Sequence, residues 1–156
     1  MECKECISVS KIKPIFIESR IFEGKCWIIE HAYPTKYKGW FVIVLKQHKE
    51  ALHELTKEEF NELGVLQENL IRALHKTLNC QKEYCCCFAE GEGFKHIHFH
   101  IIAVPGDLPS DLRGIHIFSM IKVTPEESLP KDEIVKMCKP IKKELGSLIK
   151  KIYLKG

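Results

Sequence analysis

The sequence predicts a single α+β domain built on an antiparallel β-sheet, with one long helix across the sheet and a helical region at the C-terminal end. Three observations support this prediction. Short apolar runs bounded by turn residues occur on both sides of one long segment with helical periodicity. The connections between these runs are short enough for hairpins, which join antiparallel strands. A chain of 156 residues, 45% of them hydrophobic, is also long enough to bury one core.

Three strands are expected in the first part of the chain. The runs "PIFIESR" at 14–20 and "CWIIE" at 26–30 have strand composition and are separated by a turn at Glu23-Gly24. The run "WFVIVL" at 40–45 is continuously apolar, which is typical of a strand buried on both faces. This third run is therefore the expected central strand.

The long helix is the most clearly marked element of the sequence. Thr56 is followed three residues later by Glu59, the spacing of a capping box that satisfies free N–H groups at a helix start. Apolar residues then recur at helical spacing: Phe60, Leu63, Leu66, Leu70, Leu74 and Leu78. This pattern predicts an amphipathic helix that begins after Thr56.

The second half of the chain returns to strands before it ends in a helix. Strands are expected at 83–90 and 96–104, joined by a tight loop that contains two glycines. The segment 129–153 is amphipathic, and Pro140 and Gly146 predict that its helix is kinked or broken.

Composition excludes several classes of protein. The net charge of +3 is small and its Lys and Arg residues are dispersed, so a nucleic-acid partner is not expected. No apolar run approaches the roughly 18 residues of a membrane span, and the first residues lack a secretory pattern. The 8 cysteines are therefore expected to be reduced thiols of a cytoplasmic protein.

Three histidines stand at every second position of an apolar run. In "HIHFHII", His96, His98 and His100 alternate with apolar residues, so on a strand the three imidazoles would share one face. Neighbours would be about 6.6 Å apart and the outer pair about 13 Å. Two of them could share a metal ion, but a row suits an elongated polar ligand such as a phosphate chain. The alternative is a chance row of exposed histidines on an edge strand.

The chemistry of imidazole agrees with such a ligand. Its ordinary pKa lies near neutrality, so one ring can act as a neutral nucleophile while another donates a proton. A neutral ring needs an acceptor, such as a backbone carbonyl, to hold its tautomer.

These residues resemble the histidine triad (HIT) family of nucleotide hydrolases and transferases. The run "HIHFHII" matches the family signature, and "GWFVIVLKQHKEALHELTKEEFNEL" is similar to the family's strand, Lys-x-His turn and helix. The resemblance covers about residues 3–105 of a single domain at 1–156, with 106–156 as a C-terminal extension. The C-terminal extension of the chain is similar to that of bacterial members described as diadenosine polyphosphate hydrolases. The resemblance implies a five-stranded antiparallel half-barrel crossed by a helix, a homodimer and no organic cofactor.

The resemblance also implies a role for each histidine. His98 would attack the α-phosphorus of a nucleotide and form a nucleotidyl-histidine, His100 would face the leaving atom, and His96 would orient His98. The substrate would be a dinucleoside polyphosphate or a nucleoside phosphoramidate. Two alternatives stay open: a nucleotide-binding module with little turnover, and a small structural zinc protein.

The sequence departs from the family pattern in two places. Relatives often carry Gly-Gln-Ser/Thr before the triad, whereas this chain has Gly91, Glu92 and Gly93, which lack the hydroxyl and add a carboxylate. Their backbone N–H groups could still bind an anion, or the segment is a plain hairpin turn. Relatives also have Gly-His where this chain has Gly39-Trp40, and Trp40 is expected in the core. The family's ribose-binding acid falls near Glu30 or His31.

A zinc site is also expected from the N-terminal segment. Cys3 and Cys6 form a Cys-x-x-Cys pair, which is half of a tetrahedral site. By resemblance to zinc-binding members of the family, His48 and His96 would supply the other two ligands. The remaining histidines, such as His75, are isolated in the sequence, and Cys80 gives no functional signal.

Overall fold

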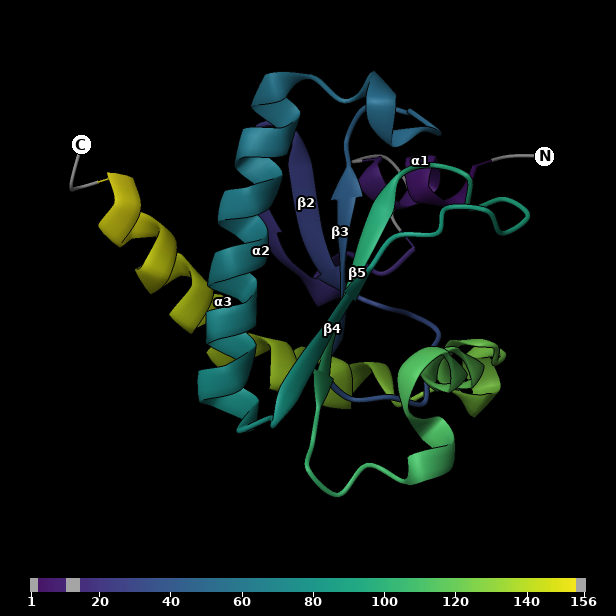
Figure 1. Cartoon of the computed structure of the whole chain (residues 1–156). Helices are drawn as coiled ribbons and strands as arrows, with labels where there is room; N and C mark the ends of the chain where they lie inside the picture. The colour runs from purple at the N-terminus through teal and green to yellow at the C-terminus, as the bar shows by residue number, and fades with distance from the viewer. Residues whose placement is uncertain (1–2, 11–14, 154–156) are drawn as a thin grey trace.

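The computed structural model of the chain describes residues 3–10 and 15–153. It contains a five-stranded sheet in the order β1-β2-β3-β5-β4, in which all neighbouring strands are antiparallel (Figure 1). The strands are β1 Arg20–Glu23, β2 Trp27–His31, β3 Trp40–Leu45, β4 Lys82–Cys86 and β5 His98–Val104. The α-helices are α1 Lys4–Val9, α2 Lys57–Leu78 and α3 Lys131–Tyr153, and short 3-10 turns occupy 17–19, 52–54, 110–112, 114–121 and 125–127. The predicted α+β architecture is confirmed.

The two faces of the sheet have different coverings. The long helices α2 and α3 pack on one face, over a core that includes Trp27, Phe41 and Ile101 (Figure 1). On the other face a second apolar cluster, with Trp40 and Ile117, is covered by the 3-10 segment 114–121. The side chains of His98 and His100 in β5 lie on this second face. One face of the sheet therefore holds the main core, while the other can hold a ligand.

The long helix forms as predicted. The Thr56 hydroxyl accepts a hydrogen bond from the Glu59 N–H at 3.2 Å, and the Glu59 carboxylate accepts one from the Thr56 N–H at 2.6 Å. The helix ends at Asn79, whose φ of 50° lies in the left-handed region that Asn tolerates.

The predicted strand at 14–20 is wrong for the residues that the structure describes, and residue 14 lies outside them. The Ser19 N–H donates to the Phe16 carbonyl at 3.2 Å, which closes a 3-10 turn at Ile17–Ser19, and the Ser19 hydroxyl donates to the same carbonyl at 2.7 Å. The strand begins only at Arg20. A local side-chain hydrogen bond therefore prevails over the strand composition of this run.

The expected break in the C-terminal helix is also wrong. α3 continues through Pro140 and Gly146 as one helix. Its buried side chains recur at helical spacing and pack into the core: Ile134, Cys138, Ile141, Leu145 and Ile149. Burial of this stripe offsets the hydrogen bond lost at proline.

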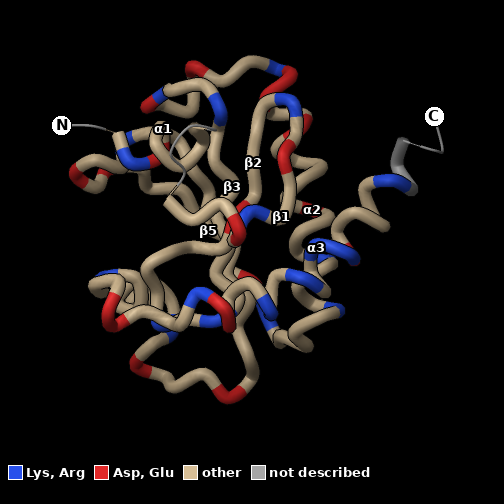
Figure 2. The backbone as a smooth tube through the Cα atoms, turned by 180° about the vertical axis from the view of Figure 1, so that it is seen from behind, with Lys and Arg blue, Asp and Glu red and all other residues tan. Residues whose placement is uncertain are grey.

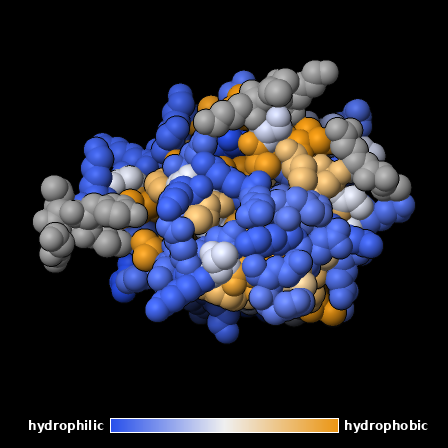
Figure 3. Space-filling view, turned by 90° about the horizontal axis from the view of Figure 1, so that it is seen from above, coloured by the Kyte–Doolittle hydropathy of each residue, from blue (hydrophilic) through white to orange (hydrophobic). Residues whose placement is uncertain are grey.

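Charge and hydropathy show how the surface is built. Lys, Arg, Asp and Glu are spread over the helices and loops, whereas β3 and β5 carry none of them (Figure 2), in keeping with the dispersed charge of the sequence. The view from above is mainly hydrophilic, with small apolar patches between the charged groups (Figure 3). Within the described residues, no helix combines the length and apolar character needed to cross a membrane. All 8 cysteines are free thiols.

Candidate active site

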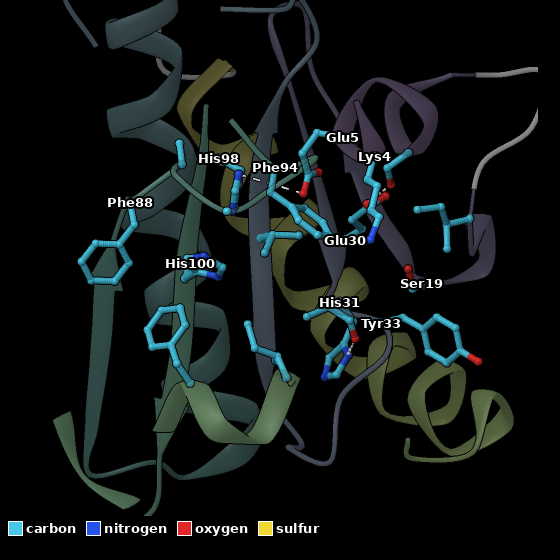
Figure 4. A pocket seen from close by; sticks show the side chains of 18 of the residues that line it. Lys4, Glu5, Ser19, Glu30, His31, Tyr33, Phe88, Phe94, His98 and His100 are labelled. Carbon is cyan, nitrogen blue, oxygen red and sulfur yellow. Dashed lines mark hydrogen bonds and ion pairs between the residues drawn. The ribbon is translucent and has the colours of Figure 1, made fainter. Parts of the chain in front are cut away.

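A cavity of about 370 Å³ lies on the sheet face that carries His98 and His100 (Figure 4). Its floor comes from β2, β3 and β5, and its walls come from α1, the segment 88–94 and the 3-10 segment 114–121. The register explains the floor: His100 stands opposite Val42, which stands opposite Glu30 on β2. Alternation along β5 therefore brings the two histidines into one cavity with a carboxyl group from β2.

His98 is held as a neutral ring with one free nitrogen. Its Nδ1 lies 2.8 Å from the backbone carbonyl oxygen of His96, so Nδ1–H donates and the lone pair is on Nε2. Burial lowers the pKa of His98, since only 6% of the residue is exposed. A neutral imidazole with a fixed tautomer is the form that acts as a nucleophile.

His100 has the opposite arrangement of donor and acceptor. The indole Nε1–H of Trp40 donates to His100 Nδ1 at 3.0 Å, so the ring hydrogen of His100 is on Nε2. Burial and the neighbouring His98 lower the pKa of His100 to about 3, which keeps the ring neutral. The two ring centroids are 4.8 Å apart. The pair thus offers a lone pair from His98 beside an N–H donor from His100.

Trp40 is a core residue, as expected, and it also contacts the candidate active site. The side chain is fully buried, yet its one polar atom is aimed at a site histidine. The register pairs Trp40 with Ile102, so Trp40 is the diagonal neighbour of His100 across β3 and β5. This relation depends on strand register, which the sequence alone did not reveal.

His96 leaves the row that the sequence predicted. β5 begins at His98, and the N–H of Ile97 donates to the carbonyl of Lys49 at 2.9 Å, which draws this part of the chain toward the loop after β3. The His96 and His48 rings are therefore 4.9 Å apart. His96 contributes its backbone carbonyl to His98 and its side chain to a different cluster.

That cluster contains Cys3, Cys6, His48 and His96. The Cys6 sulfur lies 3.2 Å from His48 Nδ1 and 3.5 Å from His96 Nδ1, and the Cys3 sulfur lies 3.7 Å from His96 Nδ1. All four donor atoms lie within 4.8 Å of one another. Two thiolates and two imidazoles at such separations are a set that fits tetrahedral zinc. The four residues named from the sequence are thus brought together.

The short helix α1 connects this cluster to the cavity. Its N-cap is Cys3, whose sulfur accepts a hydrogen bond from the Cys6 N–H at 3.4 Å. Its other side presents Glu5 and Ser8 to the cavity, where the Ser8 hydroxyl donates to Glu30. A metal held by the two cysteines would therefore also hold a wall of the cavity in place.

Two buried carboxyl groups face the cavity. Glu5 is 4.0 Å from His98 Nδ1, and burial together with Glu30 raises the pKa of Glu5 to about 8. Burial also raises the pKa of Glu30, although Arg20 opposes this shift from 3.6 Å. Glu5 was missed by sequence reasoning, because nothing local marks a glutamate between two cysteines as a cavity residue.

Aromatic pairs line two sides of the cavity. Phe16 and Tyr33 meet edge to face at 5.2 Å, and Phe88 and Phe118 meet at 5.4 Å. Figure 4 shows Phe88 and Tyr33 on opposite sides of the two histidines. Phe118 also contacts the His100 ring, with centroids 4.9 Å apart.

The loop before the triad is divided between cavity and solvent. Gly91 lines the cavity, whereas Glu92 is exposed and is not among the lining residues. The Gly93 carbonyl accepts a hydrogen bond from the Lys4 N–H at 2.9 Å, and its φ of 79° favours glycine. Of the three loop residues predicted to contact substrate, only Gly91 borders the cavity.

Comparison with known proteins gives the relation of this chain to others. A family model described as scavenger mRNA decapping enzyme C-terminal binding matches residues 3–116. A hypothetical histidine triad nucleotide-binding protein from Sulfolobus tokodaii has a TM-score of 0.70 at 16% identity, over 94% of this chain and 93% of that chain. No curated protein matches the chain.

Two further solved structures have the same fold. A zinc-bound histidine triad family protein from Mycobacterium smegmatis has a TM-score of 0.66 at 16% identity, over 93% of this chain and 96% of that chain. The diadenosine triphosphate hydrolase of Plasmodium falciparum has a TM-score of 0.63 at 14% identity, over 87% of this chain and 82% of that chain. The chain therefore has the histidine triad fold and belongs to the scavenger mRNA decapping enzyme C-terminal binding family.

Proposed function

We propose that the protein is a nucleotidyl hydrolase or transferase that uses His98 as its nucleophile. The observation that carries this proposal is the hydrogen bond from His98 Nδ1 to the His96 carbonyl, because it leaves Nε2 as a lone pair inside the cavity. The neutral state of the buried ring adds to its nucleophilicity. The family match and the fold both agree with nucleotide chemistry.

The reaction proceeds in two balanced steps. In the first, His98 Nε2 forms a bond to the α-phosphorus as the bond from phosphorus to the leaving oxygen breaks, and His100 Nε2–H hydrogen-bonds that oxygen. In the second, the oxygen of water or of another hydroxyl acceptor attacks the same phosphorus, its proton passes to solvent, the N–P bond breaks, and His98 recovers its lone pair. Donors aimed at the developing negative charge stabilise both transition states.

The favoured substrate is a dinucleoside polyphosphate. Aromatic pairs on opposite sides of the histidines suit a molecule with a planar base at each end and phosphates between them. A phosphoramidate with a small leaving group would use only one of these pairs. One of the similar folds is a diadenosine triphosphate hydrolase, which supports the same choice.

Zinc would be held by Cys3, Cys6, His48 and His96, and its chemistry there would be structural. The cluster uses four protein ligands, as closed structural sites do. A zinc-bound protein occurs among the similar folds. In this proposal the His96 ring binds zinc, and the His96 carbonyl accepts the hydrogen bond from His98.

The resemblance to the histidine triad family also leads us to propose a homodimer.

A nucleotide-binding module with little turnover is the second candidate. It is favoured by the two carboxyl groups of Glu5 and Glu30, which would repel a phosphate when ionised. Gly93 also brings no hydroxyl to the site.

Turnover of a substrate panel separates these functions. Diadenosine polyphosphates and adenosine phosphoramidate are incubated with the wild type and with His98→Asn, and a nucleotidyl adduct is sought by intact mass. His53→Asn, on an exposed turn, is the matched control. The proposal expects turnover and an adduct in the wild type and control but not in His98→Asn. Nucleotide binding without turnover in any variant identifies the binding module, and turnover by His98→Asn overturns the role of His98.

A further inference from the structure

Three side chains able to bind a metal meet at the opposite end of the sheet from the histidine cavity. His75 lies in the last turn of α2, Cys80 follows the end of that helix, and Glu83 is in β4 (Figure 1, where α2 passes into β4). Lys82 pairs with Val104 at the far end of β5 from His98, so roughly 20 Å of strand separate this group from the cavity. None of the three residues contributes to the proposed reaction.

The donor atoms lie close to the separations that a metal site needs. Glu83 Oε1 is 3.1 Å from the Cys80 sulfur and 3.7 Å from His75 Nδ1, and the three donors lie within 4.8 Å of one another. Zinc bonds of about 2.0–2.3 Å at tetrahedral angles place ligands roughly 3.3–3.7 Å apart. The Cys80 sulfur and the imidazole nitrogen lie within 4.8 Å of each other, and His75 can adjust this separation because its side chain is 66% exposed.

The backbone presents these ligands in a fixed arrangement. The Asn79 N–H donates to the His75 carbonyl at 3.0 Å, and Asn79 takes the left-handed conformation that turns the chain out of the helix. After the turn, the Gln81 N–H donates to the Val104 carbonyl at 2.9 Å, which attaches the start of β4 to the end of β5. The backbone of helix end, turn and strand start is thus hydrogen-bonded, so little backbone conformational entropy would be lost on binding.

The charge of these ligands and their access to solvent also suit the binding of a cation. One carboxylate and one thiolate would balance a divalent ion, and the neutral imidazole would complete the set. A surface hollow bordered by α2, β4 and α3 reaches His75 and Glu83 and gives an ion a path from solvent. Glu144, which also borders the hollow, is already paired with Lys76 at 2.8 Å. The candidate protein ligands are therefore the three named residues, and a water molecule would complete a four-coordinate site.

We propose that His75, Cys80 and Glu83 form a second metal site, which binds one divalent ion of intermediate softness such as zinc or cobalt. A thiolate disfavours magnesium and calcium, which prefer oxygen ligands. Binding releases the thiol proton, so affinity rises with pH. The ion ties the end of α2 to the first residues of β4 and stabilises this edge of the sheet. The competing arrangement is a metal-free group in which the thiol donates to Glu83 and His75 forms an exposed ion pair.

Metal counting on the full chain tests this site. Wild-type protein is dialysed against zinc, and bound ions are counted by atomic spectroscopy alongside His75→Ala, Cys80→Ser and Cys85→Ser. Cys85 is an exposed thiol on the same strand outside the cluster, so Cys85→Ser is the matched control. His75→Ala is the decisive variant, because an exposed side chain can be removed without opening the core.

The expected result is the loss of one ion per chain in His75→Ala and Cys80→Ser, with Cys85→Ser unchanged. Cobalt then gives a thiolate-to-metal absorption band that Cys80→Ser reduces and Cys85→Ser retains. His48→Ala removes a ligand of the other cluster, so its loss of an ion is counted separately and does not depend on this site. Equal metal content in the wild type and His75→Ala overturns the proposal.

Discussion

The indole Nε1–H of Trp40 donates a hydrogen bond to His100 Nδ1 over 3.0 Å, between buried side chains on neighbouring strands. An indole can only donate, so this bond requires a lone pair on Nδ1 and fixes the His100 hydrogen on Nε2. The donor that the proposed reaction needs therefore depends on Trp40.

Trp40→Phe keeps an aromatic ring and removes this donor. We expect turnover to fall about 10- to 100-fold with little change in KM, because His100 loses its fixed orientation. The ¹⁵N chemical shifts of His100 report the change of tautomer directly, whether or not a substrate is known.

The matched control for Trp40 is Trp27→Phe. Trp27 is also fully buried, and its Nε1–H donates to the Glu59 carbonyl at 2.8 Å, on the opposite face of the sheet. Both variants should lower the free energy of unfolding by about 1–3 kcal/mol. Unchanged His100 shifts in Trp40→Phe, or an equal loss of turnover in the two variants, would remove the specific role of Trp40.

Phe88→Ala tests the aromatic pair beside His100. Phe88 is 54% exposed, so its removal should leave the fold intact. Stacking of a base is worth about 1–3 kcal/mol, so kcat/KM for a dinucleoside polyphosphate should fall about tenfold, while a phosphoramidate with a small leaving group is unaffected. Phe60→Ala, an exposed phenylalanine on α2, is the control. Equal losses for both substrates would show that Phe88 does not contact the leaving group.

Glu5→Gln tests the buried carboxyl beside His98. The amide keeps the size of the side chain and cannot ionise. Because the pKa of Glu5 is raised to about 8, its carboxylate charge is present mainly above that pH. At pH 9 a nucleotide phosphate should therefore bind Glu5→Gln about tenfold more tightly than the wild type, and at pH 6 the two proteins should bind alike. Glu92→Gln should leave the affinity unchanged, because Glu92 is exposed and does not border the cavity. Calorimetric titration with a nucleotide compares the two. Tighter binding by Glu92→Gln would restore the role that the sequence suggested for that residue.

The buried His31 predicts a loss of stability in acid. Its Nδ1–H donates to the Ala32 carbonyl at 2.8 Å and its Nε2 accepts from the Gly39 N–H at 3.2 Å, so both nitrogens are used by the neutral ring. Burial lowers the pKa of His31 from 6.5 to about 4. Between these values the unfolded chain binds the extra proton, so the free energy of unfolding falls as pH is lowered.

The slope expected from His31 is about 1.4 kcal/mol per pH unit within this window. His31→Gln keeps a donor and an acceptor and should remove this part of the slope in urea unfolding, while His53→Gln, on an exposed turn, should not. The same slope in His31→Gln as in the wild type would assign the acid sensitivity to other groups.

Cys6→Ser tests the metal at the N-terminal cluster. A ligand that binds only the folded state at about 100 times its Kd stabilises that state by about 2.7 kcal/mol, so zinc should raise the Tm of the wild type. In Cys6→Ser the rise should shrink, and Cys26→Ser, whose thiol lies outside the cluster, should respond as the wild type does. An equal rise in all three proteins would place the zinc elsewhere.

The sequence by itself determined the elements that local patterns encode. The capping box at Thr56, the leucine spacing of α2 and the apolar run of β3 each depend on residues a few positions apart, and each formed as predicted. The alternation of His98 and His100 likewise follows from the geometry of one strand. The resemblance to a known family then grouped Cys3, Cys6, His48 and His96 as ligands of one metal.

Only the tertiary structure decided how distant segments meet at the sites. Register between β3 and β5 placed Trp40 against His100, and the docking of α1 brought Glu5 to His98. The turn after α2 gathered His75, Cys80 and Glu83, which looked unrelated along the chain. These contacts follow from strand pairing and from packing over long sequence separations. A single sequence carries no local period that reports them, whereas helix and strand patterns repeat within a few residues.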